Sequence, residues 1–328
     1  MRVTVEGPFD FALTAGHLTR YRGRDGADIL HEGAYYRALA HPDGRPVRRD
    51  DGRVLVGAAQ PVPAGEATRA SEDGRWVDLD IWVPGGGTPQ EEALAAQRMG
   101  WLLGLDADMA GFHALLDADP VLSAGVGSQR GLRPGRAASV FEALVQAVVG
   151  QQISAAVARA IREALVDTLG SPAEADGLVM HAFPEPAAIL DAGIDGLRAL
   201  KLSARKAEYL REAAQRTLDG ELAPERFAAM DDEAAVAALT EVRGVGRWTA
   251  AWVLLGALGR SDLLPAGDLA LQRTVGLLYG DGERLSETAL ERFAERWRPY
   301  RGYATLYLFA HLRQLRAAQA AQQPEGPR

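Results

Sequence analysis

The feature that most constrains the fold is the stretch EVRGVGRWTAAW at residues 241–252. Apolar residues recur at helical spacing before it, in residues 233–243, and after it, in residues 247–258, so two helices are predicted. The Gly-Val-Gly tripeptide between them permits a tight turn, because glycine tolerates positive φ and leaves the backbone bare. We therefore predict a helix–hairpin–helix whose amides point outward at the second helix and can bind an anion such as a DNA phosphate. An ordinary glycine stop followed by a new helix is the alternative.

Composition removes several classes of chemistry. The 328 residues contain no cysteine, which excludes disulfides, thiolate nucleophiles, iron–sulfur clusters and cysteine-bound zinc. The six histidines show no metal-ligand spacing, so we expect no cofactor and no metal held by side chains. The chain starts without a signal-peptide core and has no membrane-length apolar run, so we expect a soluble cytoplasmic protein. The net charge of −8 argues against a nucleic-acid partner, although a phosphate bound by backbone amides needs little positive charge.

The pattern of apolar residues changes near residue 90. Before it, residues 32–41, 53–60 and 75–83 are typical of strands, with turns rich in glycine and aspartate between them. From residue 90 onward the period becomes helical. We therefore predict a strand-rich α+β domain over residues 1–89, followed by a mainly helical domain over residues 90–328.

One carboxylate stands out downstream of the hairpin. Asp268 ends the turn Pro-Ala-Gly-Asp at residues 265–268 and precedes a helical run, which is the position of a helix N-cap. Capping alone can explain this residue. Backbone amides and the helix dipole also stabilise a carboxylate there, so we expect it to stay ionised. Such a group can stabilise an oxocarbenium-like sugar and activate water, which is what cleaving a base from deoxyribose requires.

The hairpin GVGRWTA followed by a Gly-Asp turn resembles the helix–hairpin–helix superfamily of DNA glycosylases, and most closely its 3-methyladenine DNA glycosylase II (AlkA-type) branch. Residues 141–154, 200–210 and 294–309 agree with that branch, and residues 8–18 resemble its opening segment. The resemblance implies a small α+β N-terminal domain followed by a mainly α, two-part helical domain containing the hairpin. The active site is then expected in the cleft between the two helical parts.

The resemblance also implies roles for individual residues. Asp268 matches the catalytic aspartate, although relatives often carry a second acid in this turn. Trp248 stands where strand-cutting relatives carry a nucleophilic lysine, which implies a monofunctional enzyme. Trp248 and Trp252 share a helix face, Phe309 matches a pocket tryptophan and His17 an N-terminal aromatic, so the four are the predicted base pocket. An aromatic face attracts a cationic alkylated purine and stacks a flipped base. Packing in the core is the alternative for these aromatics.

Contacts with DNA follow from the same resemblance. Gln152, at the break between two helices, corresponds to the wedge that fills the gap left by a flipped base, and a solvated loop residue is its alternative. Arg133 and Arg136 are predicted phosphate contacts. The sequence leaves open whether the carbonyl oxygens of the hairpin bind a monovalent cation. The predicted DNA-binding hairpin comprises Gly244, Val245, Gly246, Arg247 and Thr249.

These residues predict a monofunctional DNA glycosylase that removes alkylated, cationic purines such as 3-methyladenine and 7-methylguanine from double-stranded DNA in base excision repair. We expect a monomer that needs no cofactor and is associated with the nucleoid. A non-catalytic DNA-binding module is one alternative, but it needs neither Asp268 nor an aromatic helix face. A glycosylase of the same fold for oxidised or deaminated bases is another. Its neutral leaving group would need more catalytic help than one carboxylate readily gives.

Overall fold

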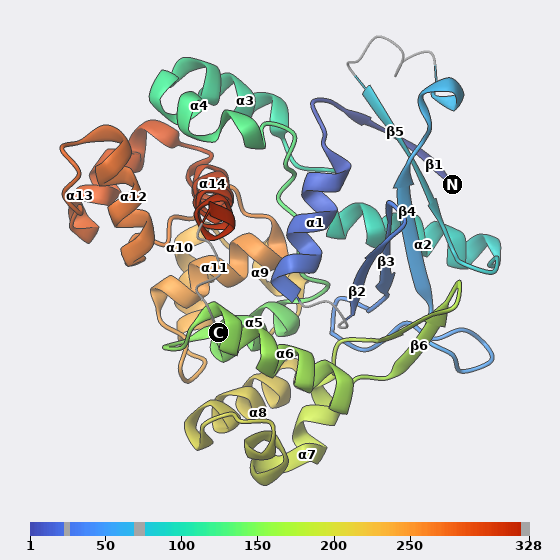
Figure 1. Ribbon diagram of the computed structural model, residues 1–328. Helices are drawn as coiled ribbons and strands as arrows, with labels where there is room; N and C mark the ends of the chain where they lie inside the picture. Colours follow the sequence, from blue (N-terminus) through green and yellow to red (C-terminus); the bar gives the residue numbers. More distant parts are fainter. Residues whose placement is uncertain (23–26, 69–75, 323–328) are drawn as a thin grey trace.

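The N-terminal part is built on a five-stranded antiparallel sheet (Figure 1). The computed structural model describes residues 1–22, 27–68 and 76–322. The strand order is β1-β5-β4-β3-β2. The strands are β1 (Arg2–Glu6), β2 (Asp28–His31), β3 (Ala34–Ala38), β4 (Val56–Pro61) and β5 (Trp76–Trp82). The three strands predicted from the alternating pattern are confirmed as β3, β4 and β5.

Two helices flank this sheet. Helix α1 (Phe11–Arg22) lies beside β2, and α2 (Pro89–Leu102) packs on β4 and β5. Met99 of α2 is fully buried in one apolar core with Leu79 and Ile81 of β5. Thr88 caps α2 with a capping box. The predicted boundary at residues 89 and 90 stays a prediction, and the first helix beyond it contributes to the core of the sheet.

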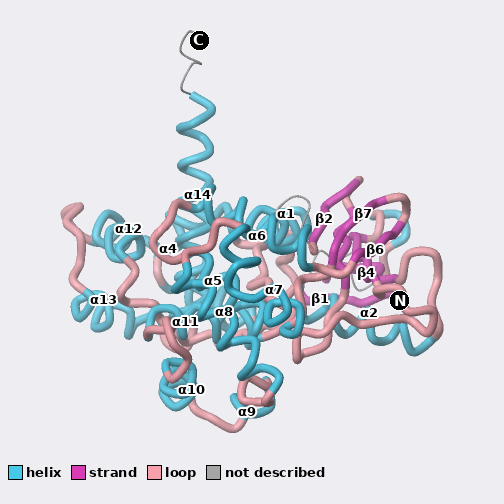
Figure 2. Tube along the Cα trace, turned by 90° about the horizontal axis from the view of Figure 1, so that it is seen from below, coloured by secondary structure: helices cyan, strands magenta, loops and turns pink. Residues whose placement is uncertain are grey.

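The rest of the chain is mainly helical. A short strand pair, β6 and β7, interrupts it, and the helical pattern did not indicate that pair. The last helix, α14, continues to Gln322 and projects from the body (Figure 2). Further short elements are η1 (Ala64–Glu66), η2 (Gly127–Gln129) and η3 (Glu295–Trp297). The main elements are α3 (Met109–Ala118), α4 (Pro120–Val126), α5 (Val140–Gly150), α6 (Ala155–Leu169), β6 (Pro172–Ala175), β7 (Leu178–His181), α7 (Pro186–Ala199), α8 (Ala204–Leu218), α9 (Pro224–Ala228), α10 (Asp232–Thr240), α11 (Arg247–Leu258), α12 (Leu269–Tyr279), α13 (Glu287–Ala294) and α14 (Arg301–Gln322).

The helices form two apolar cores that meet at α11. One core gathers buried residues of α5, α6, α8 and α10, and the other gathers those of α3, α4, α12 and α14. Leu254 of α11 belongs to the first core and Leu255 to the second. The expected α+β domain followed by a two-part helical domain is therefore confirmed. Within the described residues, no helix is both long and apolar enough to cross a membrane.

Candidate active site

The carboxylate of Asp268 lies at the start of α12. Its Oδ1 accepts hydrogen bonds from the amides of Ala270 at 2.9 Å and Leu271 at 3.1 Å, which confirms the predicted N-cap. Its Oδ2 accepts a third bond, from the indole Nε1 of Trp248 at 3.0 Å. Three donors and the positive end of the helix dipole therefore stabilise negative charge on this group.

Asp268 opens into a cavity of about 340 Å³ between the two helical parts. One wall comes from α11, where residues at positions i, i+4 and i+8 face the space. The opposite wall comes from α5, and α1, α6 and α14 close the sides. The side chains and glycines that line it are His17, Leu18, Gly135, Ala137, Ala143, Gln146, Ala147, Gly150, Arg162, Trp248, Trp252, Gly256, Asp268, Leu306 and Phe309. A flipped base requires such a pocket.

The four residues predicted for a base pocket meet in this cavity. Trp248 is 37% exposed, while Trp252 and Phe309 are half-buried and touch edge to face with ring centroids 5.4 Å apart. His17 of α1 lines the same cavity, and its Nδ1 lies 2.9 Å from Nη2 of Arg313. Aromatic surface, a carboxylate and open space thus come together at one place.

A second cavity of about 420 Å³ lies on the other side of Trp248. Its wall is charged, with acids such as Asp232 and Glu233 and with Arg247, Arg298 and Arg301. Asp268 does not line it, and Trp248 is its one aromatic side chain among the described residues. Such a wall offers no pair of faces between which a base can stack, so the smaller cavity is the better candidate.

The helix–hairpin–helix is present as predicted, with α10 and α11 joined by the turn at residues 241–246. Gly244 has φ of +81°, and a Cβ there would lie 2.2 Å from the ring of Tyr209, so glycine is required. No side chain caps α11, which leaves its first amides without a side-chain acceptor. Val245 and Thr249 are buried, so among the predicted hairpin residues the exposed ones are Gly246 and Arg247.

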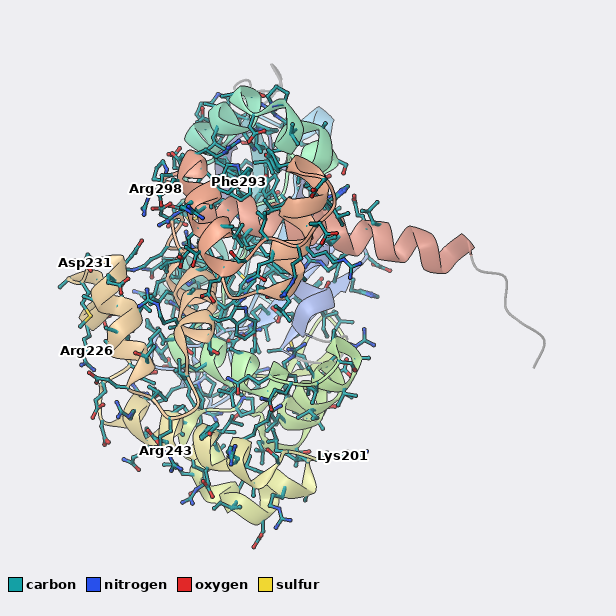
Figure 3. All side chains as sticks on the ribbon, turned by 90° about the vertical axis from the view of Figure 1, so that its left-hand side faces the viewer. Lys201, Arg226, Asp231, Arg243, Phe293 and Arg298 are labelled. Atoms are coloured by element: carbon teal, nitrogen blue, oxygen red, sulfur yellow. The ribbon has the colours of Figure 1, made fainter. Side chains whose placement is uncertain are left out.

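The cations of the hairpin are paired with acids. Arg247 bonds Glu233 at 2.7 Å, and Arg243 lies 3.4 Å from Glu208. Figure 3 shows Arg243 and Lys201 at the same end of the molecule. Because these exposed pairs offset charge, the bare amides of the turn are the stronger candidate for a phosphate contact.

The loop between α5 and α6 is tied to the hairpin. Gln151 Nε2 donates to the carbonyl of Gly244 at 2.8 Å and to Thr249 Oγ1 at 3.3 Å. Lys206 Nζ donates to the carbonyls of Val149 and Gln151, at 2.8 and 2.6 Å. Burial lowers the pKa of Lys206. These bonds hold the segment that presents Gln152.

Gln152 itself is exposed, as a wedge must be. It has a left-handed backbone with φ of +56°, which is uncommon for a residue with a side chain. The neighbouring side chains Ile153 and Val157 are 36% and 49% exposed and present an apolar surface next to it. The exposed surface of this loop therefore combines one amide with two aliphatic groups.

The burial of Arg133 and Arg136 contradicts the predicted phosphate contacts. They are 4% and 3% exposed. Arg133 donates to backbone carbonyls, including that of Ala107 at 3.2 Å, and Arg136 bonds Asp106 at 2.7 Å while its guanidinium lies over the ring of Trp101. Both arginines therefore join segments within the protein.

The sequence reasoning missed two polar residues of the cavity. Gln146 on α5 and Arg162 on α6 both line it. Gln146 lies one helical turn before Gly150, where the long apolar stretch breaks. Counting back one turn from that break would have placed it on the same face as Ala143 and Ala147.

Two similarities to known proteins identify the family. Residues 145–299 match the model of the HhH-GPD superfamily base excision DNA repair protein. A DNA-3-methyladenine glycosylase from Bacillus subtilis is 30% identical over 205 residues, which are 62% of this chain and 68% of the relative. The chain belongs to this superfamily. The predicted resemblance to DNA-3-methyladenine glycosylases is confirmed.

Two further similarities extend over nearly the whole chain. A probable bifunctional transcriptional activator/DNA repair enzyme AlkA from Mycobacterium tuberculosis is 31% identical over 95% of this chain, which spans only 57% of that relative. The solved structure of a 3-methyladenine DNA-glycosylase from Archaeoglobus fulgidus has a TM-score of 0.78 and 28% identity, over 96% of this chain and 98% of that one. The N-terminal sheet is therefore part of the shared fold.

Proposed function

We propose that the protein is a monofunctional DNA glycosylase that removes cationic, alkylated purines from double-stranded DNA in base excision repair. The observation that carries this proposal is the opening of the Asp268 carboxylate and two tryptophan rings into one cavity. Family membership supports the same reaction class.

The contacts support separate roles for the aromatic rings and the carboxylate in the reaction. An alkylated purine carries positive charge and is attracted to the electron-rich faces of Trp248 and Trp252. As the glycosidic bond breaks, positive charge develops on the sugar, and the carboxylate of Asp268 stabilises it and orients the attacking water. A cationic base leaves without a proton donor, which suits a cavity whose one acidic group is Asp268.

The lysines support base removal without strand cleavage. A covalent imine needs an amine in the cavity, and Lys201 and Lys206 are the only lysines in the chain. Neither lines the cavity; Lys201 is exposed, and Lys206 is bound to backbone carbonyls. We expect no covalent adduct with damaged DNA on borohydride treatment, and an adduct through either lysine would contradict the proposal.

Two segments are proposed to hold the duplex. The uncapped start of α11, from Gly246, binds a phosphate through its amides, and Gln152 enters the stack and bonds the orphaned base. We propose that the protein acts as a monomer. We place its work in the cytoplasm, at the nucleoid.

The two alternative functions require different chemical groups in the cavity. A non-catalytic DNA-binding module does not need a carboxylate held by three donors beside an aromatic cavity. A glycosylase for oxidised or deaminated bases needs protonation of a neutral leaving group, and Asp268 is the one carboxylic acid among the described residues of the cavity. Both alternatives predict no release of alkylated purines.

The test is the variant Asp268→Asn. Asparagine is as good an N-cap as aspartate, so the fold and the binding of a duplex with an abasic-site analogue should persist. Release of 3-methyladenine from methylated DNA, measured by chromatography, should fall by orders of magnitude because the developing charge loses its counterion. Asp231→Asn is the matched control, since Asp231 caps α10 in the same way outside the cavity. Equal release by Asp268→Asn and the wild type would remove the catalytic assignment.

A further inference from the structure

The α5 wall of the cavity has one hydrogen-bonding side chain. Ala143, Ala147 and Gly150 line it with small groups or none, and a Cβ on Gly150 would meet no atom within 4 Å. A base can therefore lie close to the backbone of α5 at this wall. Gln146, on the same face, is the group of α5 that can bond an edge of that base.

Buried charges fix the orientation of this amide. Gln146 Nε2 donates to Glu142 Oε1 at 2.9 Å. The carboxylate of Glu142 accepts from a cation and from a backbone amide, so the nitrogen of the Gln146 amide is the atom that faces it. Glu142 is 1% exposed and accepts from Arg37 Nη2 at 2.7 Å and from the amide of Ala138 at 3.2 Å.

Arg37 completes this chain of contacts from the N-terminal sheet. It is 1% exposed and also bonds the buried carboxylate of Asp28. Burial alone lowers the pKa of Arg37, but the charges of Asp28 and Glu142 outweigh it and leave the pKa above its usual value. A fixed cation thus holds Glu142, and Glu142 holds the nitrogen of Gln146. The oxygen Oε1 of Gln146 remains as the acceptor.

We propose that Gln146 determines which damaged bases are accepted, by receiving a hydrogen bond on Oε1 from an exocyclic amino group of the flipped base. Arg37 and Glu142 are positioning residues that keep this acceptor in place. The inference rests on the proposed function and sharpens its substrate class to purines with an amino group. In a base with a carbonyl in place of the amine, such as hypoxanthine, the carbonyl oxygen would face Oε1 of Gln146. Both atoms are hydrogen-bond acceptors, so neither would be paired.

The experiment compares two bases in three proteins. Single-turnover rates are measured for 3-methyladenine in methylated DNA and for hypoxanthine in a defined duplex. The proteins are the wild type, Gln146→Met and Gln215→Met. Gln215 is the matched control, because on α8 it makes the same i, i+4 contact to a carboxylate, Asp219, at 2.9 Å outside the cavity. Methionine keeps the length of the side chain and removes the acceptor.

We expect Gln146→Met to release 3-methyladenine about tenfold more slowly or worse, with hypoxanthine release unchanged or faster. Gln215→Met should change neither rate. Equal slowing for both bases, or no change for either, would overturn the assignment of Gln146 while leaving the glycosylase function intact. Absence of 3-methyladenine release by the wild type would instead overturn the proposed function, and the inference with it.

Discussion

Replacing Arg37 with methionine tests the buried network that joins the sheet to α5. The guanidinium lies between two carboxylates, bonding Asp28 at 2.5 Å and Glu142 at 2.7 Å. Asp28 also accepts from the hydroxyl of Tyr35. Methionine keeps much of the side-chain volume and removes the guanidinium that both acids share. The variant therefore removes from two buried carboxylates the cation that lies between them.

The structure gives the size of the effect. Breaking a buried ion pair by removing one partner costs about 3–5 kcal/mol. Asp28 and Glu142 are 0% and 1% exposed and lose the same cation, so the upper part of that range applies. With an unfolding entropy of about 2 cal/mol/K per residue, a chain of 328 residues loses about 1.5 °C of Tm per kcal/mol. We expect the Tm to fall by about 6–7 °C.

Calorimetric melting of purified variants at pH 7 measures this loss. Arg53→Met is the matched control, because Arg53 pairs with Asp51 at the surface, where their side chains are 74% and 48% exposed, and such a pair contributes about 1 kcal/mol or less. The double variant Arg37→Met/Glu142→Gln should recover part of the Tm, since one uncompensated charge is gone. If Arg37→Met and the control Arg53→Met have the same Tm, the network does not stabilise the fold and the reasoning fails.

Three further outcomes follow from single contacts. Gly244→Ala should lower the free energy of unfolding by about 2–4 kcal/mol in denaturant titration, because the positive φ and the ring of Tyr209 exclude a Cβ. Lys206→Met should weaken binding to an abasic-site duplex about tenfold in fluorescence anisotropy, since Nζ holds the Gln152 loop, whereas Lys201→Met, with the same charge change, should not. Burial lowers the pKa of His113, so the folded state resists protonation, and stability should fall as pH drops below about 6.5. His113→Leu should flatten that dependence in melts between pH 7 and 5.5.

Features that depend on near neighbours in the chain could be predicted from the sequence. Asp268 caps α12 as predicted, and Ser154 before α6 and Pro186 at the start of α7 are local signals of the same kind. A capping side chain bonds an amide two or three residues away, so a short window contains both partners. The glycines of the hairpin belong to the same class, because the demand for positive φ at Gly244 arises within one turn.

Features that depend on partners far away in the chain could not be predicted from the sequence. The loop containing Arg133 and Arg136 is polar and rich in glycine, which is typical of an exposed segment. Their partners lie elsewhere in the chain, Asp106 thirty residues before Arg136 and Glu6 127 residues before Arg133. Gln146 is similar, since the arginine that fixes Glu142 is 105 residues away. Burial decides the role of a polar side chain, and the pattern of the sequence does not encode such contacts.

The role of Trp248 shows why the hairpin and the cavity must be considered together. The turn that can bind a phosphate ends at Gly246, and Trp248 follows two residues later, in the first turn of α11. Its ring forms a wall of the cavity, and its Nε1 bonds the carboxylate of Asp268. A lysine here would place an amine beside that carboxylate, whereas tryptophan places a neutral donor and an aromatic face. The phosphate contact, the base wall and the carboxylate are thus connected through the first turn of one helix. In the proposed reaction, we therefore expect a duplex bound at the hairpin to bring a flipped nucleotide to Asp268 in a fixed register.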